Sequence, residues 1–279
     1  MASDTLVWPV LSVAWIVLIP TLTICLASWL VSRVANMSFY TYAALGVIGV
    51  PLHEIAHAIA CLMFRMRIMK VALYAPEPET GRLGYVAFAY NPRSITHAVG
   101  LVVQGVAPLL LSAAIFMGLF PMPAAAEIRA LGAGGGWFEV QILEGVNLGL
   151  ALILGNLMTG IEGWLWAVLA LLIGAYGIPS WSDVRLALRG TLVLALVLGG
   201  VLYLCTAAEY LVPNPLRADL SRAFEQTSSA SVEVMGGLIS GVTMVSVVGL
   251  TGVLMIQLLP ALASFFMASA WRRLRAQES

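Results

Sequence analysis

The sequence has very little charge. Asp, Glu, Lys and Arg together make up 10% of its 279 residues, whereas hydrophobic residues make up 61%. A water-soluble domain needs much more charge than this to cover its surface, so the composition excludes that class. The chain is therefore predicted to be an all-α polytopic membrane protein, with the lipid bilayer as its surroundings.

Other scarce features exclude further classes. The formal net charge is zero and no run of Lys or Arg is interleaved with aromatic residues, so nucleic acid is not expected as a partner. The glycine-rich stretch Gly132–Gly136 lacks the strand before it and the helix after it that a phosphate cradle requires, so no nucleotide site is expected. The three cysteines, Cys25, Cys61 and Cys205, stand singly in apolar segments. This spacing argues against disulfides and thiolate metal sites, and we expect small core residues.

Apolar runs of about 20 residues match a hydrocarbon core about 30 Å thick. About six such runs are predicted to be transmembrane helices: Trp8–Ser32, Phe39–Phe64, Ile95–Phe120, Trp164–Tyr176 with its flanks, Thr191–Leu211 and Val234–Met267. The stretch Val146–Pro179 around the fourth run fits either one long tilted helix or an interfacial helix followed by a short span. We favour the second alternative.

The basic residues indicate an orientation, because cytoplasmic loops retain Lys and Arg. With both termini inside, ten of the 14 basic residues are cytoplasmic: Arg65, Arg67, Lys70, Arg82, Arg93, Arg185, Arg189, Arg272, Arg273 and Arg275. The other four lie on the opposite side: Arg33, Arg129, Arg217 and Arg222. We expect a multi-pass protein of the cell membrane with both termini in the cytoplasm.

A small β-hairpin is predicted between the second and third spans. The segments Ile68–Tyr74 and Leu83–Tyr90 are rich in β-branched and aromatic residues, and they flank a tip, Ala75–Arg82, that contains Pro and Gly. An irregular interfacial loop is the alternative.

The second span contains the segment His53-Glu54-Ile55-Ala56-His57. Residues four apart share a helix face, so His53 and His57 can bind one metal ion with Glu54 beside them. Zinc lowers the pKa of a bound water from 15.7 to about 7, and a neighbouring carboxylate can then act as base. Such a motif can arise by chance on a solvated helix. Here two of the three histidines lie in an apolar span, where ionisable groups are costly and usually functional. Pro51 fits either an ordinary kink or an opening of the helix toward a wet cavity.

A catalytic zinc ion needs a third protein ligand. Asp183 is the first choice, because the second and fourth spans run the same way and place it on the same side as His57. His97, at the start of the third span, is the second choice. Glu162 and Glu209 lie nearer the opposite face in this topology and are poor candidates.

The sequence resembles the site-2 protease family of intramembrane zinc metalloproteases. The resemblance is spread over Phe39–Val184, about half of the chain, and four segments carry it: Pro51–Ala58, the predicted hairpin, Gly105–Pro108 and Pro179–Asp183. It implies that His53, His57 and Asp183 hold zinc and that Glu54 activates water for hydrolysis of a peptide bond in a membrane-protein substrate. It also implies that the hairpin presents an extended substrate segment.

The family's aspartate commonly lies in the pattern Asn-x-x-Pro-x-x-x-Leu-Asp-Gly. Here Ser182 precedes Asp183, Val184 follows it, and the nearest upstream asparagine is Asn156. This departure favours an alternative, a non-proteolytic accessory subunit of a membrane complex with a structural or vestigial zinc site. A transporter or channel is less favoured, because the fifth and sixth spans contain almost no ionisable groups. In either case we expect one membrane domain over residues 1–279, with a zinc-binding core at about 39–184 and C-terminal helices at about 188–271. Oligomeric state is not indicated.

Overall fold

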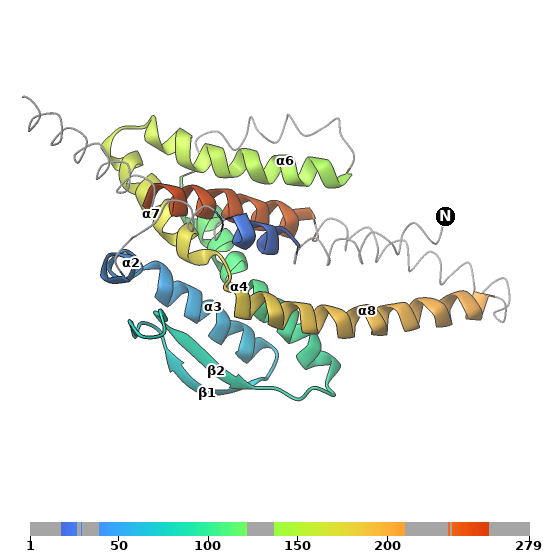
Figure 1. The fold of residues 1–279 in the computed structure, drawn as a ribbon. Coiled ribbons are helices and arrows are strands. Elements are labelled where there is room, and N and C mark those ends of the chain that lie inside the picture. Colours follow the sequence, from blue (N-terminus) through green and yellow to red (C-terminus); the bar gives the residue numbers. More distant parts are fainter. Residues whose placement is uncertain are drawn as a thin grey trace, which may run out of the picture.

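The computed structural model describes residues 18–26, 29, 39–121, 137–209, 234 and 236–256, and it is mostly helical (Figure 1). A helical segment covers 18–26. The elements that follow it are α2 (Phe39–Leu45), α3 (Gly49–Met63), β1 (Arg67–Ala72), β2 (Tyr85–Ala89), α4 (Ile95–Leu119), α6 (Trp137–Leu150), a π-helical turn (Ala151–Gly155), α7 (Ile161–Gly177), α8 (Trp181–Glu209) and a further helix, Gly236–Ile256.

Two of the described helices, α4 and Gly236–Ile256, are long and apolar enough to cross a membrane. Two bent pairs pass the same test together: α2 with α3, bent by 67°, and α7 with the start of α8, bent by 60°. The described residues therefore contain two to four candidate spans, which agrees with a membrane protein, and the predicted number of six is not confirmed. The first predicted span falls largely outside the described residues.

Two predicted boundaries need correction. The second span is not one helix, because it bends between α2 and α3. The fifth run was predicted to begin at Thr191, but α8 begins at Trp181. Polar residues in the first turns of α8 hid this start from a search for apolar runs. Of the two alternatives for Val146–Pro179, one long helix is excluded: the stretch divides at Gly160, whose φ of 93° a residue with a side chain rarely adopts.

The largest core cluster lies where α4, α6, α7 and Gly236–Ile256 meet. Its buried members include Leu109, Phe116, Leu148, Ile173 and Val245. Helix α3 packs on α4 and α7, and the hairpin lies against α3 on the side away from α6 (Figure 1). Helix α3 is therefore held between the helical core and the hairpin.

The cysteine prediction is correct for Cys61, which is fully buried, and wrong for Cys25, which is exposed. In a membrane protein the outward face of a helix is also apolar, so apolar sequence neighbours do not indicate the interior. The side chain of Cys205 lies outside the described residues.

The predicted hairpin is confirmed. Strands β1 and β2 pair antiparallel, with Arg67 opposite Ala89 and Ala72 opposite Tyr85, and the register shifts between Ile68 and Lys70. Beyond the strands, the backbone N–H of Ala75 donates to the carbonyl of Leu83 at 2.6 Å. Because β1 pairs with only one side of β2, the other edge of β2 has no strand partner in the described part of the chain.

Candidate metal centre

The first half of the site is carried by α3, which begins just after the bend. Pro51 is the third residue of α3, where a missing N–H costs little because the first turn has no intrahelical acceptor for it. The proline ring also disfavours a continuous helix through the preceding residues. The bend before Pro51 and the helix after it therefore follow from the same residue. His53 and His57 lie on the next turns of α3.

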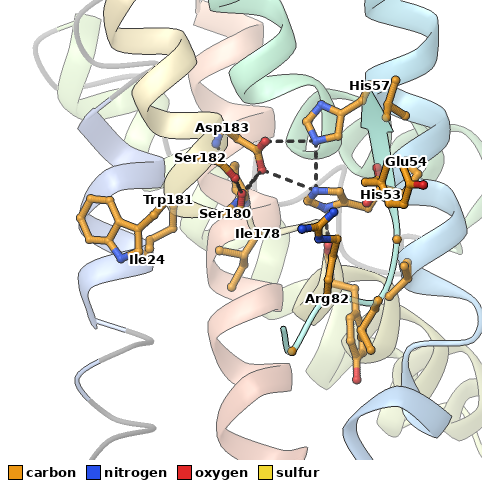
Figure 2. A pocket seen from close by; sticks show the side chains of 18 of the residues that line it. Ile24, His53, Glu54, His57, Arg82, Ile178, Ser180, Trp181, Ser182 and Asp183 are labelled. Carbon is orange, nitrogen blue, oxygen red and sulfur yellow. Dashed lines mark hydrogen bonds and ion pairs between the residues drawn. The ribbon is translucent and has the colours of Figure 1, made fainter. Parts of the chain in front are cut away.

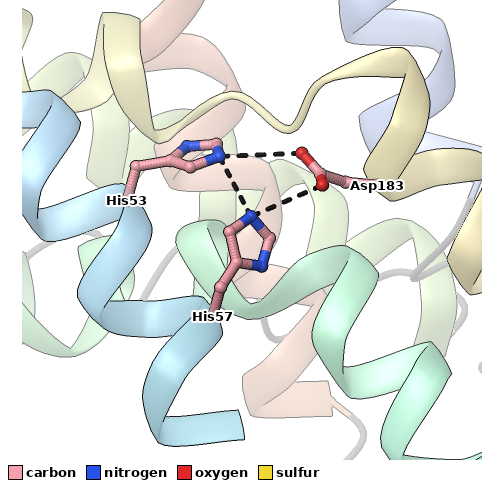
Figure 3. Close-up of side chains that lie close together, drawn as sticks. All are labelled: His53, His57 and Asp183. Carbon is pink, nitrogen blue, oxygen red and sulfur yellow. Dashed lines mark hydrogen bonds and ion pairs between the residues drawn. The ribbon is translucent and has the colours of Figure 1, made fainter. Parts of the chain in front are cut away.

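Three side chains converge at the predicted metal site (Figure 3). The Nε2 atoms of His53 and His57 lie 3.1 Å apart. Asp183 completes the group: its Oδ1 lies 3.4 Å from His57 Nε2 and its Oδ2 lies 3.6 Å from His53 Nε2. Ligand atoms bound tetrahedrally to zinc at about 2.0–2.2 Å stand about 3.3–3.6 Å from one another. The two Nε2 atoms and the two carboxylate oxygens of Asp183 thus come close to this spacing, and one ligand atom from each of the three residues lies within 4.8 Å of the other two.

The charge of the site also fits a cation. Glu54 and Asp183 are buried, with 7% and 8% of their surface exposed, and neither forms an ion pair with Lys or Arg among the described residues. A buried carboxylate is costly unless a cation or hydrogen-bond donors compensate it. Two carboxylates carry two negative charges and two neutral imidazoles carry none, so one divalent ion neutralises the group. The residues present can therefore hold a metal ion such as zinc.

His53 is oriented by the end of α7. Its Nδ1 lies 2.7 Å from the backbone oxygen of Tyr176. Because a carbonyl only accepts, Nδ1 carries the proton and donates it, which leaves Nε2 free as a ligand. The carbonyl of Tyr176 is available because α7 ends at Gly177, so its usual helical partner, the N–H of Ser180, points elsewhere.

Asp183 is oriented by the start of α8. The backbone N–H and the hydroxyl of Ser180 both donate to Asp183 Oδ2 at 2.7 Å, and the N–H of Asp183 donates to the Ser180 hydroxyl at 3.4 Å (Figure 2). This reciprocal arrangement is a capping box. The role of Ser180 was not predicted, although the spacing Ser-x-x-Asp before an apolar run is a known signal for a helix start. The role of the Tyr176 carbonyl was not predicted either, because the sequence carries no signal for it.

The position of Asp183 also depends on close contact between α4 and α8. A Cβ atom added at Gly105 would lie 2.5 Å from the backbone oxygen of Asp183 and 2.5 Å from Cβ of Ala187. Only glycine allows this approach. The segment Gly105–Pro108, on which part of the family resemblance rests, thus brings the first turn of α8 against α4.

Glu54 lies beside the two histidines in a cavity of about 1130 Å³ (Figure 2). The cavity is also lined by the three metal-site residues, by Arg82, and by Tyr85, Val86 and Phe88 of β2. The hairpin approaches Glu54 closely, because a Cβ added at Gly84 would lie 2.9 Å from Glu54 Cγ. No side chain or backbone group of the described residues donates a hydrogen bond to the Glu54 carboxylate, which leaves it available as a base.

The alternative ligands lie elsewhere. His97 is not part of the group; its Nδ1 accepts a hydrogen bond from the backbone N–H of Asn91 at 2.7 Å, at the start of α4. Glu162 is exposed in the first turn of α7. Glu209 ends α8, 26 residues beyond Asp183, which is about 39 Å along a helix. Of the predicted candidates, only His53, His57 and Asp183 come together.

Searches of protein-family models, curated proteins and solved structures found no match to this chain.

Proposed function

We propose that this protein is an intramembrane zinc metalloprotease that hydrolyses a peptide bond of a membrane-protein substrate. The observation that carries the proposal is the convergence of His53, His57 and Asp183 at zinc-ligand spacing, with the unpaired carboxylate of Glu54 in the same cavity. Zinc, when bound, supplies a Lewis acid that acidifies water and polarises a carbonyl group.

The residues of the chain have separate tasks in this reaction. His53, His57 and Asp183 hold the metal ion. Glu54 takes a proton from the attacking water as the new carbon–oxygen bond forms, and it delivers that proton to the leaving nitrogen as the carbon–nitrogen bond breaks. The products are a carboxylate and an amine, so hydrolysis needs no reagent besides water.

The cavity suits an extended peptide. A helix hides its carbonyl groups in backbone hydrogen bonds, so a substrate must unwind at the site. Strand β2 lines the cavity and has a free edge among the described residues, and this edge can bind an extended segment through backbone hydrogen bonds. We infer that a substrate segment pairs there, beside Glu54.

The alternative, an accessory subunit with a structural or vestigial zinc site, is favoured by the absence of an asparagine shortly before Asp183. Two observations argue for catalysis instead. Structural zinc sites are closed, with four protein ligands, whereas the described residues supply three ligands here and the group opens on a cavity. A structural site also has no use for Glu54.

The experiment compares the wild type with Glu54→Gln, purified in detergent, on fluorescent single-span peptides that carry a helix-breaking Gly-Pro pair at the middle of the span. We expect both proteins to bind one zinc ion per chain and the variant to cleave about 10²–10⁴-fold more slowly. Stoichiometric zinc with no cleavage that depends on Glu54 would support the accessory subunit and contradict the protease.

A further inference from the structure

Two buried polar atoms near the metal site have no hydrogen-bond partner: Nδ1 of His57 and Oε1 of Gln104. Both residues are almost fully buried, with 5% and 2% of their surface exposed, and both line the same cavity. Most buried polar groups in proteins are paired, because an unpaired one costs about 1–3 kcal/mol. Two unpaired groups at one cavity therefore call for an explanation.

The two atoms have complementary chemistry once a metal ion is bound. His57 directs Nε2 toward Asp183 and His53, so Nδ1 carries the proton of the neutral imidazole and is a donor. Oε1 of Gln104 is an acceptor. Histidines that bind a metal through one nitrogen almost always donate the other N–H to an acceptor, which fixes the ring. His53 has such an acceptor in the carbonyl of Tyr176, whereas His57 has none.

The packing of α3 on α4 brings these residues to the same interface. Ala56 and Ala60, on either side of His57, pack against Ala107, which lies one turn beyond Gln104 on α4. In Figure 3 the ring nitrogen of His57 that does not face Asp183 is turned toward the ribbon of α4. Small residues at this interface let the two helices approach closely.

We propose that Gln104 is a positioning residue for the metal site: its Oε1 accepts the hydrogen bond of His57 Nδ1, directly or through one water. The assignment rests on the proposed zinc site and extends it to a side chain that touches no metal. Gln104 orients the His57 ring and makes Nε2 a better ligand, as the carbonyl of Tyr176 does for His53.

The test is the zinc dissociation constant of the purified full chain, measured by competition with a chromophoric chelator. Gln104→Leu keeps the approximate size of the side chain without an acceptor, and we expect zinc to bind about 10–100-fold more weakly. Gln104→Glu restores an acceptor, and we expect affinity within about threefold of the wild type or tighter. Gln104→Met is a second apolar variant in case Leu prevents folding.

Ser246→Ala is the matched control, because Ser246 Oγ is likewise buried and unpaired but does not line the cavity. We expect it to leave zinc affinity unchanged. Wild-type affinity in the apolar Gln104 variants would overturn the assignment, as would a Glu variant as weak as Leu. If the apolar variants keep zinc affinity but raise KM, Gln104 contacts the substrate and not His57. Failure of the wild type to bind zinc would instead overturn the proposed function.

Discussion

The described part of the chain contains two bent helix pairs, and each bend precedes a part of the metal site, but the two bends are held in different ways. The bend between α2 and α3 is held by hydroxyl groups from distant segments: Tyr74 of the hairpin donates to the carbonyl of Ala43 at 2.7 Å, and Tyr176 of α7 donates to the carbonyl of Tyr42. The bend between α7 and α8 is held locally, by the capping box of Ser180 and Asp183.

The two halves of the site, the histidine pair on α3 and Asp183 on α8, therefore depend on different parts of the fold. His53 and His57 are four residues apart on one helix, so their relative position is set by α3 itself. Asp183 comes from another helix, so its distance to the histidines depends on the packing of α8. Changes at the second bend should therefore affect zinc binding, whereas changes at the first should mainly affect stability.

The largest effect is expected from Gly105→Ala. The added methyl group would meet the backbone oxygen of Asp183 and Cβ of Ala187 at 2.5 Å and displace the first turn of α8. Overpacking of this kind costs about 1–3 kcal/mol, and a metal site tolerates ligand shifts of only about 0.2 Å. We expect at least a tenfold loss of zinc affinity, measured by chelator competition.

Gly118→Ala on the same helix is the control, because nothing lies within 4 Å of the added atom. Equal zinc affinity in the two variants would show that local capping alone places Asp183.

A smaller effect is expected from Ser180→Ala. The variant loses the hydroxyl that caps α8 and that donates to Asp183 Oδ2. Removing such a cap costs about 0.5–2 kcal/mol, and because the backbone N–H of Ser180 still donates to Asp183 Oδ2, zinc binding should weaken by about tenfold or less. Thermal unfolding in detergent and zinc titration measure the two losses.

Ser94→Ala separates the loss of stability from the loss of zinc affinity. Ser94 caps α4 by accepting a hydrogen bond from the backbone N–H of His97 at 3.3 Å, and it touches no metal-site residue. It should lower stability but not zinc affinity. Equal zinc affinity in both serine variants would contradict a role for Ser180 at the metal.

The smallest effect on the metal is expected from Tyr74→Phe, which removes the hydrogen bond to Ala43 at the first bend. A lost hydrogen bond costs about 0.5–1.5 kcal/mol, so the unfolding temperature should fall while zinc affinity stays the same. Tyr90→Phe is the control, because the Tyr90 hydroxyl forms no hydrogen bond with any described residue, and it should change neither quantity. A loss of zinc affinity in Tyr74→Phe would remove the distinction between the two bends.

The difference between locally held and distantly held features also explains how much of the structure the sequence could predict. The spacing of His53 and His57 predicted a shared face because helix geometry is local, and the turn residues of Ala75–Arg82 predicted the hairpin for the same reason. The start of α8 was also readable from its capping box and was missed. Pro51 indicated a kink at the first bend, but the hydroxyl groups of Tyr74 and Tyr176 that hold this bend could not be predicted, because only the fold brings them to Ala43 and Tyr42. The exposure of Cys25 and the burial of Gln104 likewise depend on packing.

The most direct test of the proposed metal centre is the zinc content of the purified protein and of three variants, measured by atomic emission after dialysis. We expect one zinc ion per wild-type chain, the same for His97→Ala, and little or none for His57→Ala and Asp183→Ala. Zinc retained in Asp183→Ala but lost in His97→Ala, or no zinc in the wild type, would contradict it.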